Sequence, residues 1–231
     1  MKDTFMRSCE HWSESGRNEM QNFYTLASID YKHLAERFNW KEWFEAHQAN
    51  IGKRGLKLLD IACGSGKFPS ALVQNADLSN AKILPVEYSL LDPSSFSIAE
   101  ARKVIQSPFK TSSEFETTLQ EFSCERETYD IIWATHALYA IPKNELKKAL
   151  KRFVFGMARS GFIAHASEKS HYLQFYNHYL NGFKGGSGEP YSSAEQILQI
   201  LKEINIPHRV GKITYENGVS EKASLQVEGY L

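Results

Sequence analysis

The chain has 231 residues, of which 27 are basic and 27 acidic, so its formal net charge is zero. Its length suits one sizeable α/β domain. A neutral balance argues against a nucleic-acid partner, because such proteins usually carry a basic excess or stripe. No pair of its three cysteines is spaced Cys-x-x-Cys, and no run nears the roughly 18 apolar residues that span a bilayer. We therefore expect a cytoplasmic protein with no nucleic-acid partner, membrane partner or metal site.

The N-terminal part is predicted to be helical. Apolar residues between positions 17 and 38 recur mainly every three or four residues, and a second helical piece is expected from about 40 to 49. Two glycines in the sequence "NIGKRG" then break the pattern. We expect a helical N-terminal cap over residues 1–50 and the main domain over residues 51–231.

After Gly55, short apolar runs alternate with amphipathic stretches. Strands are expected at 56–62, 82–92, 129–137 and 160–167, and helices at 67–75, 94–106, 112–122 and 143–155. Continuous apolar strands separated by helices indicate a parallel sheet that is covered on both faces. The predicted fold class is therefore α/β, with a doubly wound, Rossmann-like sheet.

The last part of the chain is predicted to contain two further helices and a strand. One helix is expected at 169–181, and Ser192 or Ser193 caps a second helix. A strand is expected at 207–217. Two interpretations of the alternating segment 223–231 stay open: it forms a final strand, or the chain ends before the sheet is complete.

The sequence "LKLLDIACGSGKF" places two glycines between the first strand and the helix that follows. Ligands of open α/β sheets bind beyond the carboxyl ends of the strands, and Asp60 lies near such an end. Gly64 and Gly66 let a ligand approach the turn, and the N–H groups of the next helix face that ligand. Asp92 ends the second strand, where an acid can accept both hydroxyls of a ribose. Because the third glycine of a dinucleotide fingerprint is missing, a nucleoside with an uncharged linker fits better.

Two motifs carry a resemblance to a known family. The sequence "LLDIACGSGKF" resembles the first motif of class I S-adenosylmethionine-dependent methyltransferases, and "YDIIWATHALYAIP" resembles their fourth-strand motif. Within this superfamily the chain is most similar to small-molecule enzymes of the histamine N-methyltransferase type, through "LLDPS", "KTSSEF", "HALYA" and "YSSAEQILQIL". The resemblance implies a methyltransferase sheet and S-adenosyl-L-methionine as the cofactor.

The strand ends and the resemblance together predict the cofactor-binding residues. Ser112 matches a position at the adenine end, and Thr135 would lie beside the cofactor near the reacting methyl. The full expected set is Asp60, Gly64, Gly66, Asp92, Ser112 and Thr135.

The expected catalytic and acceptor-binding residues are His136 and Tyr139. Histidine titrates near neutrality, so His136 is the best candidate for a general base. It stays open whether it instead contacts the substrate or the cofactor, and whether Tyr139 contacts the substrate or only packs. Glu19 and Tyr24 are expected to bind the substrate from the N-terminal helical segment, where a carboxylate would suit a cationic amine.

Some positions depart from the histamine type. The acid that recognises the amine there falls near Gly16, and Ala140 replaces the second tyrosine, so we do not expect histamine itself as the substrate. The expected reaction is methyl transfer to a small molecule, with nitrogen slightly preferred over oxygen or sulfur. The alternatives are a protein or RNA methyltransferase and a non-catalytic S-adenosylmethionine-binding protein.

Overall fold

The centre of the computed structural model is a parallel β-sheet of five strands. The structure describes residues 4–49, 51–52, 54–78 and 83–216. The strands in this part of the chain are β1 (Leu56–Ile61), β2 (Val86–Asp92), β3 (Phe109–Glu116), β4 (Tyr129–Thr135) and β5 (Met157–Ala164). Their order is β3-β2-β1-β4-β5. The order reverses between β1 and β4, so a ligand is expected at the carboxyl ends of these two strands.

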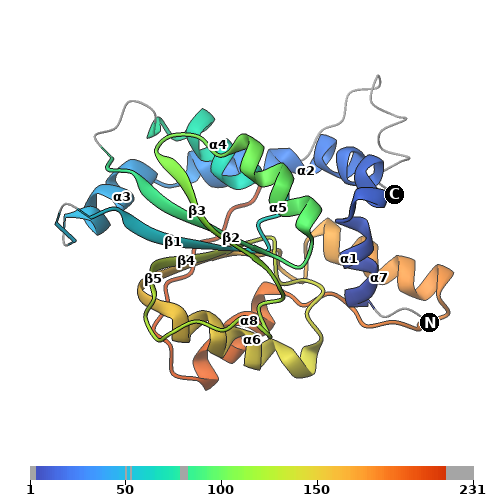
Figure 1. The fold of residues 1–231 in the computed structure, drawn as a ribbon. Coiled ribbons are helices and arrows are strands. Elements are labelled where there is room, and N and C mark those ends of the chain that lie inside the picture. Colours follow the sequence, from blue (N-terminus) through green and yellow to red (C-terminus); the bar gives the residue numbers. More distant parts are fainter. Residues whose placement is uncertain (1–3, 50, 53, 79–82, 217–231) are drawn as a thin grey trace.

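Helices cover both faces of the sheet (Figure 1). On one face lie α2 (Arg17–Arg37), α3 (Trp40–Gln48), α4 (Lys67–Asn75) and α5 (Ser95–Val104), and on the other lie α6 (Lys143–Gly156) and α8 (Ala194–Glu203). Each face has its own apolar core, with Phe44, Phe68 and Trp133 in the first and Leu150 and Leu201 in the second. The predicted doubly wound α/β fold is confirmed.

The central strands and the edge strand β3 differ in their sequences for a physical reason. β4 is buried along its whole length, and β1 and β2 along nearly all of theirs, as expected of strands covered on both faces. β3 pairs with β2 alone and is largely exposed, so it needs no continuous apolar run. The helix predicted at 112–122 is therefore wrong, because this segment begins inside β3.

The segment after α8 does not add a strand to the described sheet. Residues 205–216 have no regular structure, so the strand predicted at 207–217 is wrong over its described part. This segment runs beside α2 instead, where the ring of Tyr215 lies 4.4 Å from the ring of His33, between centroids. The final strand proposed at 223–231 lies outside the described residues.

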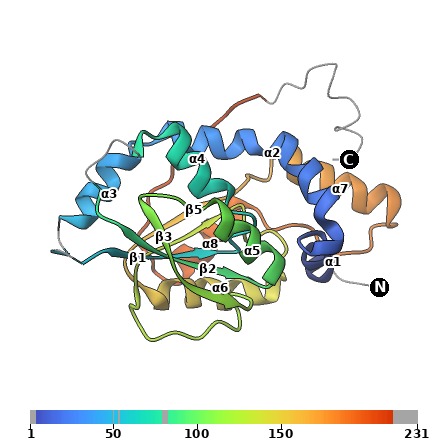
Figure 2. The same cartoon turned by 45° about the horizontal axis from the view of Figure 1, so that its top comes forward.

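The N-terminal segment closes the carboxyl end of the sheet. Here α1 (Thr4–His11), the 3-10 turn η1 (Glu14–Gly16) and α7 (His171–Phe183) lie beyond the strand ends (Figures 1 and 2). The Thr4 hydroxyl donates to the carbonyl of Glu189 at 2.8 Å, and the Ser94 hydroxyl donates to the carbonyl of Trp12. The segment is therefore tied both to the start of α5 and to the chain after α7.

Helices α2 and α3 belong to the same core as the sheet, through Tyr31, Trp40 and Phe44. Of the described elements before residue 50, α1 and η1 lie beyond the strand ends and do not belong to this core, so the division at residue 50 stays a prediction. Within the described ranges, no helix has both the length and the apolar character that crossing a membrane requires.

Candidate functional site

The turn between β1 and α4 is shaped by two glycines with positive φ. Gly64 has φ +50° and Gly66 has φ +71°. A Cβ on Gly66 would lie 2.7 Å from Cγ2 of Val104, and one on Gly64 would lie 2.9 Å from the Tyr24 hydroxyl. The fold therefore requires both glycines whether or not a ligand is present. Because α4 begins at Lys67, its first N–H groups are free to face a ligand.

The Asp92 carboxylate lies at the end of β2 and lines the cavity beside this turn. Its Oδ2 accepts the N–H of Gly64 at 3.0 Å, and its Oδ1 accepts the N–H of Ser94 at 2.9 Å. Burial raises the pKa of Asp92 to about 6. In the described ranges no lysine or arginine pairs with it, and each oxygen can still accept a further hydrogen bond. This chemistry fits the two hydroxyls of a ribose.

Asp60, near the end of β1, is the more deeply placed of the two acids. Its Oδ2 accepts a hydrogen bond from the Tyr88 hydroxyl at 2.6 Å. Burial raises the pKa of Asp60 to about 7, and Asp92 adds to this rise by charge repulsion. Near neutral pH the Asp60 carboxyl group is therefore partly protonated, whereas an acid on the protein surface is ionised at this pH.

His136 follows β4 directly and is held in one orientation. Its backbone has φ +55°, a conformation that costs a non-glycine residue on the order of 1–3 kcal/mol and that His136 shares with four other described residues, Ala62, Asp77, Glu127 and Asn205. Its N–H donates to the carbonyl of Ala164 at 2.9 Å. Its Nδ1 lies 2.6 Å from the Tyr139 hydroxyl, which also accepts the N–H of Ala166 at 3.1 Å. Tyr139 therefore orients the imidazole ring.

The His136 ring is neutral at physiological pH. Burial lowers its pKa, and the negative charge of Asp30 offsets only part of this effect. A neutral imidazole can accept a proton, which the charged form cannot. Among the described residues, Nε2 of His136 has no hydrogen-bond partner, so this atom is available to a ligand.

The chain between α7 and α8 supports this arrangement. Ser192 donates its hydroxyl to the carbonyl of Leu138 at 2.8 Å and its N–H to the carbonyl of Tyr139 at 3.1 Å. His165 stacks on Tyr139 with ring centroids 3.9 Å apart, and its Nε2 donates to the carbonyl of Ser192 at 2.9 Å. Burial lowers the pKa of His165 to about 3, so it stays neutral. Ser192 and His165 thus position the loop that carries Tyr139.

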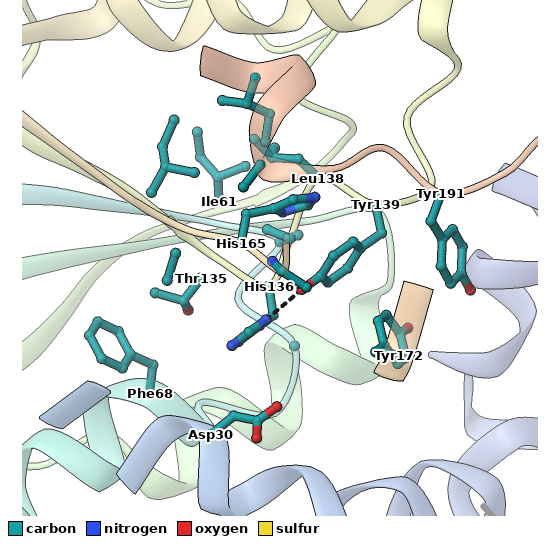
Figure 3. Close-up of a pocket in the computed structure, with 18 of the residues that line it drawn as sticks. Asp30, Ile61, Phe68, Thr135, His136, Leu138, Tyr139, His165, Tyr172 and Tyr191 are labelled. Atoms are coloured by element: carbon teal, nitrogen blue, oxygen red, sulfur yellow. Dashed lines mark hydrogen bonds between the residues drawn. The ribbon is translucent and has the colours of Figure 1, made fainter. Parts of the chain in front are cut away.

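One cavity of about 2810 Å³ collects most of the predicted site residues. Figure 3 shows His136 and Tyr139 within it, with Phe68, Tyr172 and Tyr191 nearby. Ligand pockets usually measure about 300–1,000 Å³, so a cofactor and an acceptor fit side by side. The predicted residues that line it are Glu19, Tyr24, Asp60, Gly64, Asp92, Thr135, His136 and Tyr139.

Two of the predicted cofactor-binding residues, Ser112 and Gly66, do not line the cavity. Ser112 is exposed and lies outside the cavity, because it occupies an irregular step in the middle of β3 rather than its carboxyl end. Residues 118–120, which follow the carboxyl end of β3, do line the cavity. Glu19 lines the cavity with a side chain that is 73% exposed and lies 3.5 Å from His11.

Sequence reasoning missed Asp30 and Lys67, both of which line the cavity. The ammonium group of Lys67 lies 4.7 Å from the centre of the Tyr24 ring and pairs with no acid in the described part of the chain. Lys67 could have been identified from the sequence, because it directly follows the Gly-x-Gly turn. Asp30 had a weaker sequence signal, namely an acid beside an aromatic residue in a predicted helix. The described residues contain no cluster of three or more His, Cys, Asp or Glu side chains that could hold a metal ion.

The chain matches the family described as a methyltransferase domain over residues 31–167. It therefore belongs to the methyltransferase-domain family, whose cofactor is S-adenosylmethionine. Comparison with curated protein sequences gives no significant match.

Solved structures show the same fold. Magnesium protoporphyrin IX methyltransferase from Synechocystis PCC 6803 with bound SAH is 14% identical, covers 87% of this chain and 88% of its own, and has a TM-score of 0.61. The complex of the same enzyme with SAM is 13% identical, covers 88% of this chain and 86% of its own, and has a TM-score of 0.58. The plantazolicin methyltransferase BpumL in complex with SAH is 15% identical, covers 85% of this chain and 72% of its own, and has a TM-score of 0.53. At such low identity the likeness shows the fold and does not identify the methyl acceptor.

The chain is thus an S-adenosylmethionine-dependent methyltransferase, and its residues fit this cofactor. Within the described residues, the fit rests on the buried Asp92 carboxylate, which has no cationic partner, and on the Lys67 ammonium in the same cavity, which pairs with no acid. The histamine-type specificity expected from the sequence is not confirmed.

Proposed function

We propose that this methyltransferase acts on a small-molecule acceptor, with nitrogen preferred over oxygen or sulfur. One observation carries the proposal. The neutral His136 ring, held by Tyr139, lies in the same cavity as Asp92. A neutral imidazole suits an acceptor that has to lose a proton as it is methylated.

The proposed cofactor contacts follow from the chemistry of each side chain. S-adenosylmethionine supplies an electrophilic methyl group on a sulfonium. Asp92 accepts hydrogen bonds from the ribose hydroxyls, and Lys67 pairs with the carboxylate of the amino-acid part. Residues 118–120 lie against the adenine, and Thr135 lines the wall between the cofactor and the acceptor.

The proposed acceptor chemistry uses both ring nitrogens of His136. The Tyr139 oxygen accepts hydrogen bonds from the Ala166 N–H and from the His136 Nδ1–H, which matches its two lone pairs. This tautomer leaves the lone pair on Nε2. Nε2 then takes the proton that the acceptor nitrogen loses.

Calorimetric titration with S-adenosylhomocysteine tests the cofactor half of this proposal. We expect micromolar binding by the wild type and about tenfold weaker binding by Asp92→Asn, because a charge-assisted hydrogen bond is lost. A panel of amines, phenols and thiols, incubated with S-adenosylmethionine and read by mass spectrometry, tests the acceptor half. A folded wild type that binds no cofactor would overturn the proposal. Methylation of phenols or thiols alone would replace nitrogen as the acceptor atom.

The size of the cavity supports a second candidate, an acceptor larger than a simple amine. Its volume is about 2810 Å³. Two solved structures of similar fold are named as methyltransferases of a magnesium porphyrin and of plantazolicin. Adding a porphyrin and short heterocycle-containing peptides to the same panel separates the two candidates.

A further inference from the structure

We infer that Asp30 of α2 is the anionic anchor for the methyl acceptor, which therefore carries a positively charged N–H group next to the atom that is methylated. The inference rests on the proposed function, because it assigns a substrate class to the same cavity. It names a residue that the sequence pattern did not single out.

The Asp30 carboxylate faces the reaction centre. It lines the cavity with His136 and Tyr139, and Figure 3 shows it on the opposite side of the His136 ring from the Tyr139 hydroxyl. Its negative charge acts on the His136 ring. A cation bound between Asp30 and His136 would thus lie beside the free Nε2 of His136.

Among the described residues, the carboxylate of Asp30 has no hydrogen-bond or ion-pair partner. Its Oδ1 is enclosed by protein and accepts no hydrogen bond, and none of the ion pairs between described residues includes it. A carboxylate oxygen that is removed from water costs free energy unless a donor or a cation compensates for it. His136 does not supply that cation, because burial keeps its ring neutral. No lysine or arginine in the described ranges forms an ion pair with Asp30, so a charged donor on a ligand would supply the missing partner.

The walls near Asp30 also favour a cation. The Tyr31 ring lies 5.5 Å from the His136 ring and 6.5 Å from the Phe68 ring, between centroids. Tyr172 lies 5.0 Å from Tyr139 on the other side. Aromatic faces attract ammonium groups, and the attraction grows when water is excluded. A carboxylate among aromatic rings is therefore suited to an alkylammonium ion rather than to a neutral polar group.

Asp30 and Glu19 differ in what surrounds them, although both lie on α2. They are eleven residues apart, which is about three helical turns, so they lie on nearly the same side of the helix. Glu19 is mostly exposed and has His11 as a partner at 3.5 Å. A solvated pair of this kind contributes little to the recognition of a ligand. Asp30 is only partly exposed, its Oδ1 is buried, and it has no ion-pair partner among the described residues, so it meets the requirements of an anchor.

The experiment compares amines with alcohols of the same shape. The pairs are phenethylamine with phenethyl alcohol, tryptamine with tryptophol, and histamine with imidazole ethanol. Each is titrated calorimetrically into the full chain that has been saturated with S-adenosylhomocysteine. The proteins are the wild type, Asp30→Asn, and the control Glu36→Gln, which removes an acid from the same helix outside the cavity.

We expect at least one amine to bind the wild type about tenfold more tightly than its alcohol, because a partly buried charge pair is formed. Asp30→Asn should abolish this preference and leave the affinity for S-adenosylhomocysteine unchanged, and Glu36→Gln should keep the preference. Three outcomes would overturn the inference: equal binding of amines and alcohols, an unchanged preference in Asp30→Asn, or no binding of any amine. Failure of the proposed function would appear separately, as a loss of cofactor binding by the wild type.

Discussion

The two halves of the cavity are built in different ways. The half proposed to bind the cofactor consists of the turn after β1 and the end of β2, where Gly64, Lys67 and Asp92 each lie within a few residues of a strand end. The half proposed to bind the acceptor takes Asp30 from α2 and His136 and Tyr139 from the loop after β4, with support from His165 and Ser192. The first half depends on strand ends that meet at one edge of the sheet. The second depends on distant segments packing together, so it is the half in which single hydrogen bonds position the chemistry.

The largest effect is expected in the cofactor half, from Gly66→Val. The added side chain meets Val104 at 2.7 Å from its Cβ, in a backbone with φ +71°. We expect a loss of more than about 2 kcal/mol in the free energy of unfolding, together with loss of S-adenosylhomocysteine binding. Thermal unfolding and calorimetry measure both. Gly182→Ala is the control, because its Cβ meets nothing within 4 Å in α7. Equal effects of the two changes would contradict the role of the turn.

The next effect is expected in the acceptor half, from His136→Ala. We expect turnover to fall by about 100-fold or more, because a general base is lost. The affinity for S-adenosylhomocysteine should be nearly unchanged, since Asp92 and the glycine turn remain. Steady-state kinetics and calorimetry check this, with the exposed His178→Ala as a control outside the cavity. Equal losses in turnover and in cofactor affinity would make His136 a cofactor contact.

A smaller effect is expected from Tyr139→Phe, which removes only the hydroxyl that lies 2.6 Å from His136. The ring and its stacking on His165 stay, so the fold should hold. We expect turnover to fall by about tenfold while the KM for the acceptor changes little, because the base is misoriented but still present. The pH at which activity is half-maximal should also move, and an unmoved pH profile would leave Tyr139 a packing residue.

The smallest effect is expected from Asp60→Asn, and it concerns the pH dependence of stability. Burial raises the pKa of Asp60 in the folded protein from 3.8 to about 7, so the folded state holds this proton more tightly than the unfolded chain does. The contribution of Asp60 to stability is therefore present at low pH and is lost as the pH rises through this range. The variant should show a smaller decline in the free energy of unfolding between these pH values. Chemical denaturation at several pH values measures it, and an identical decline would contradict the raised pKa.

The comparison of the two halves also explains how far prediction from the sequence could go. The strands β1 and β4, the helix α4 and the ligand-facing turn follow from short, contiguous patterns. The helix predicted at 112–122 was wrong because an exposed edge strand has no apolar run to set it apart from a helix. A strand was wrongly predicted for the segment 207–216. This segment packs along α2, and a contact with a distant helix cannot be read from the local sequence pattern.

The sequence by itself determined the α/β fold class, the place of the glycine turn, the acid at the end of β2, and His136 and Tyr139 as separate candidate residues after β4. These features depend on hydrophobic periodicity and on residues that are close together in the sequence, so they can be recognised without the tertiary structure. Only the tertiary structure brought Asp30 to the face of His136 and Ser192 against the loop after β4. The physical reason is that burial, and with it the need of a polar group for a partner, is decided by every segment that packs around that group.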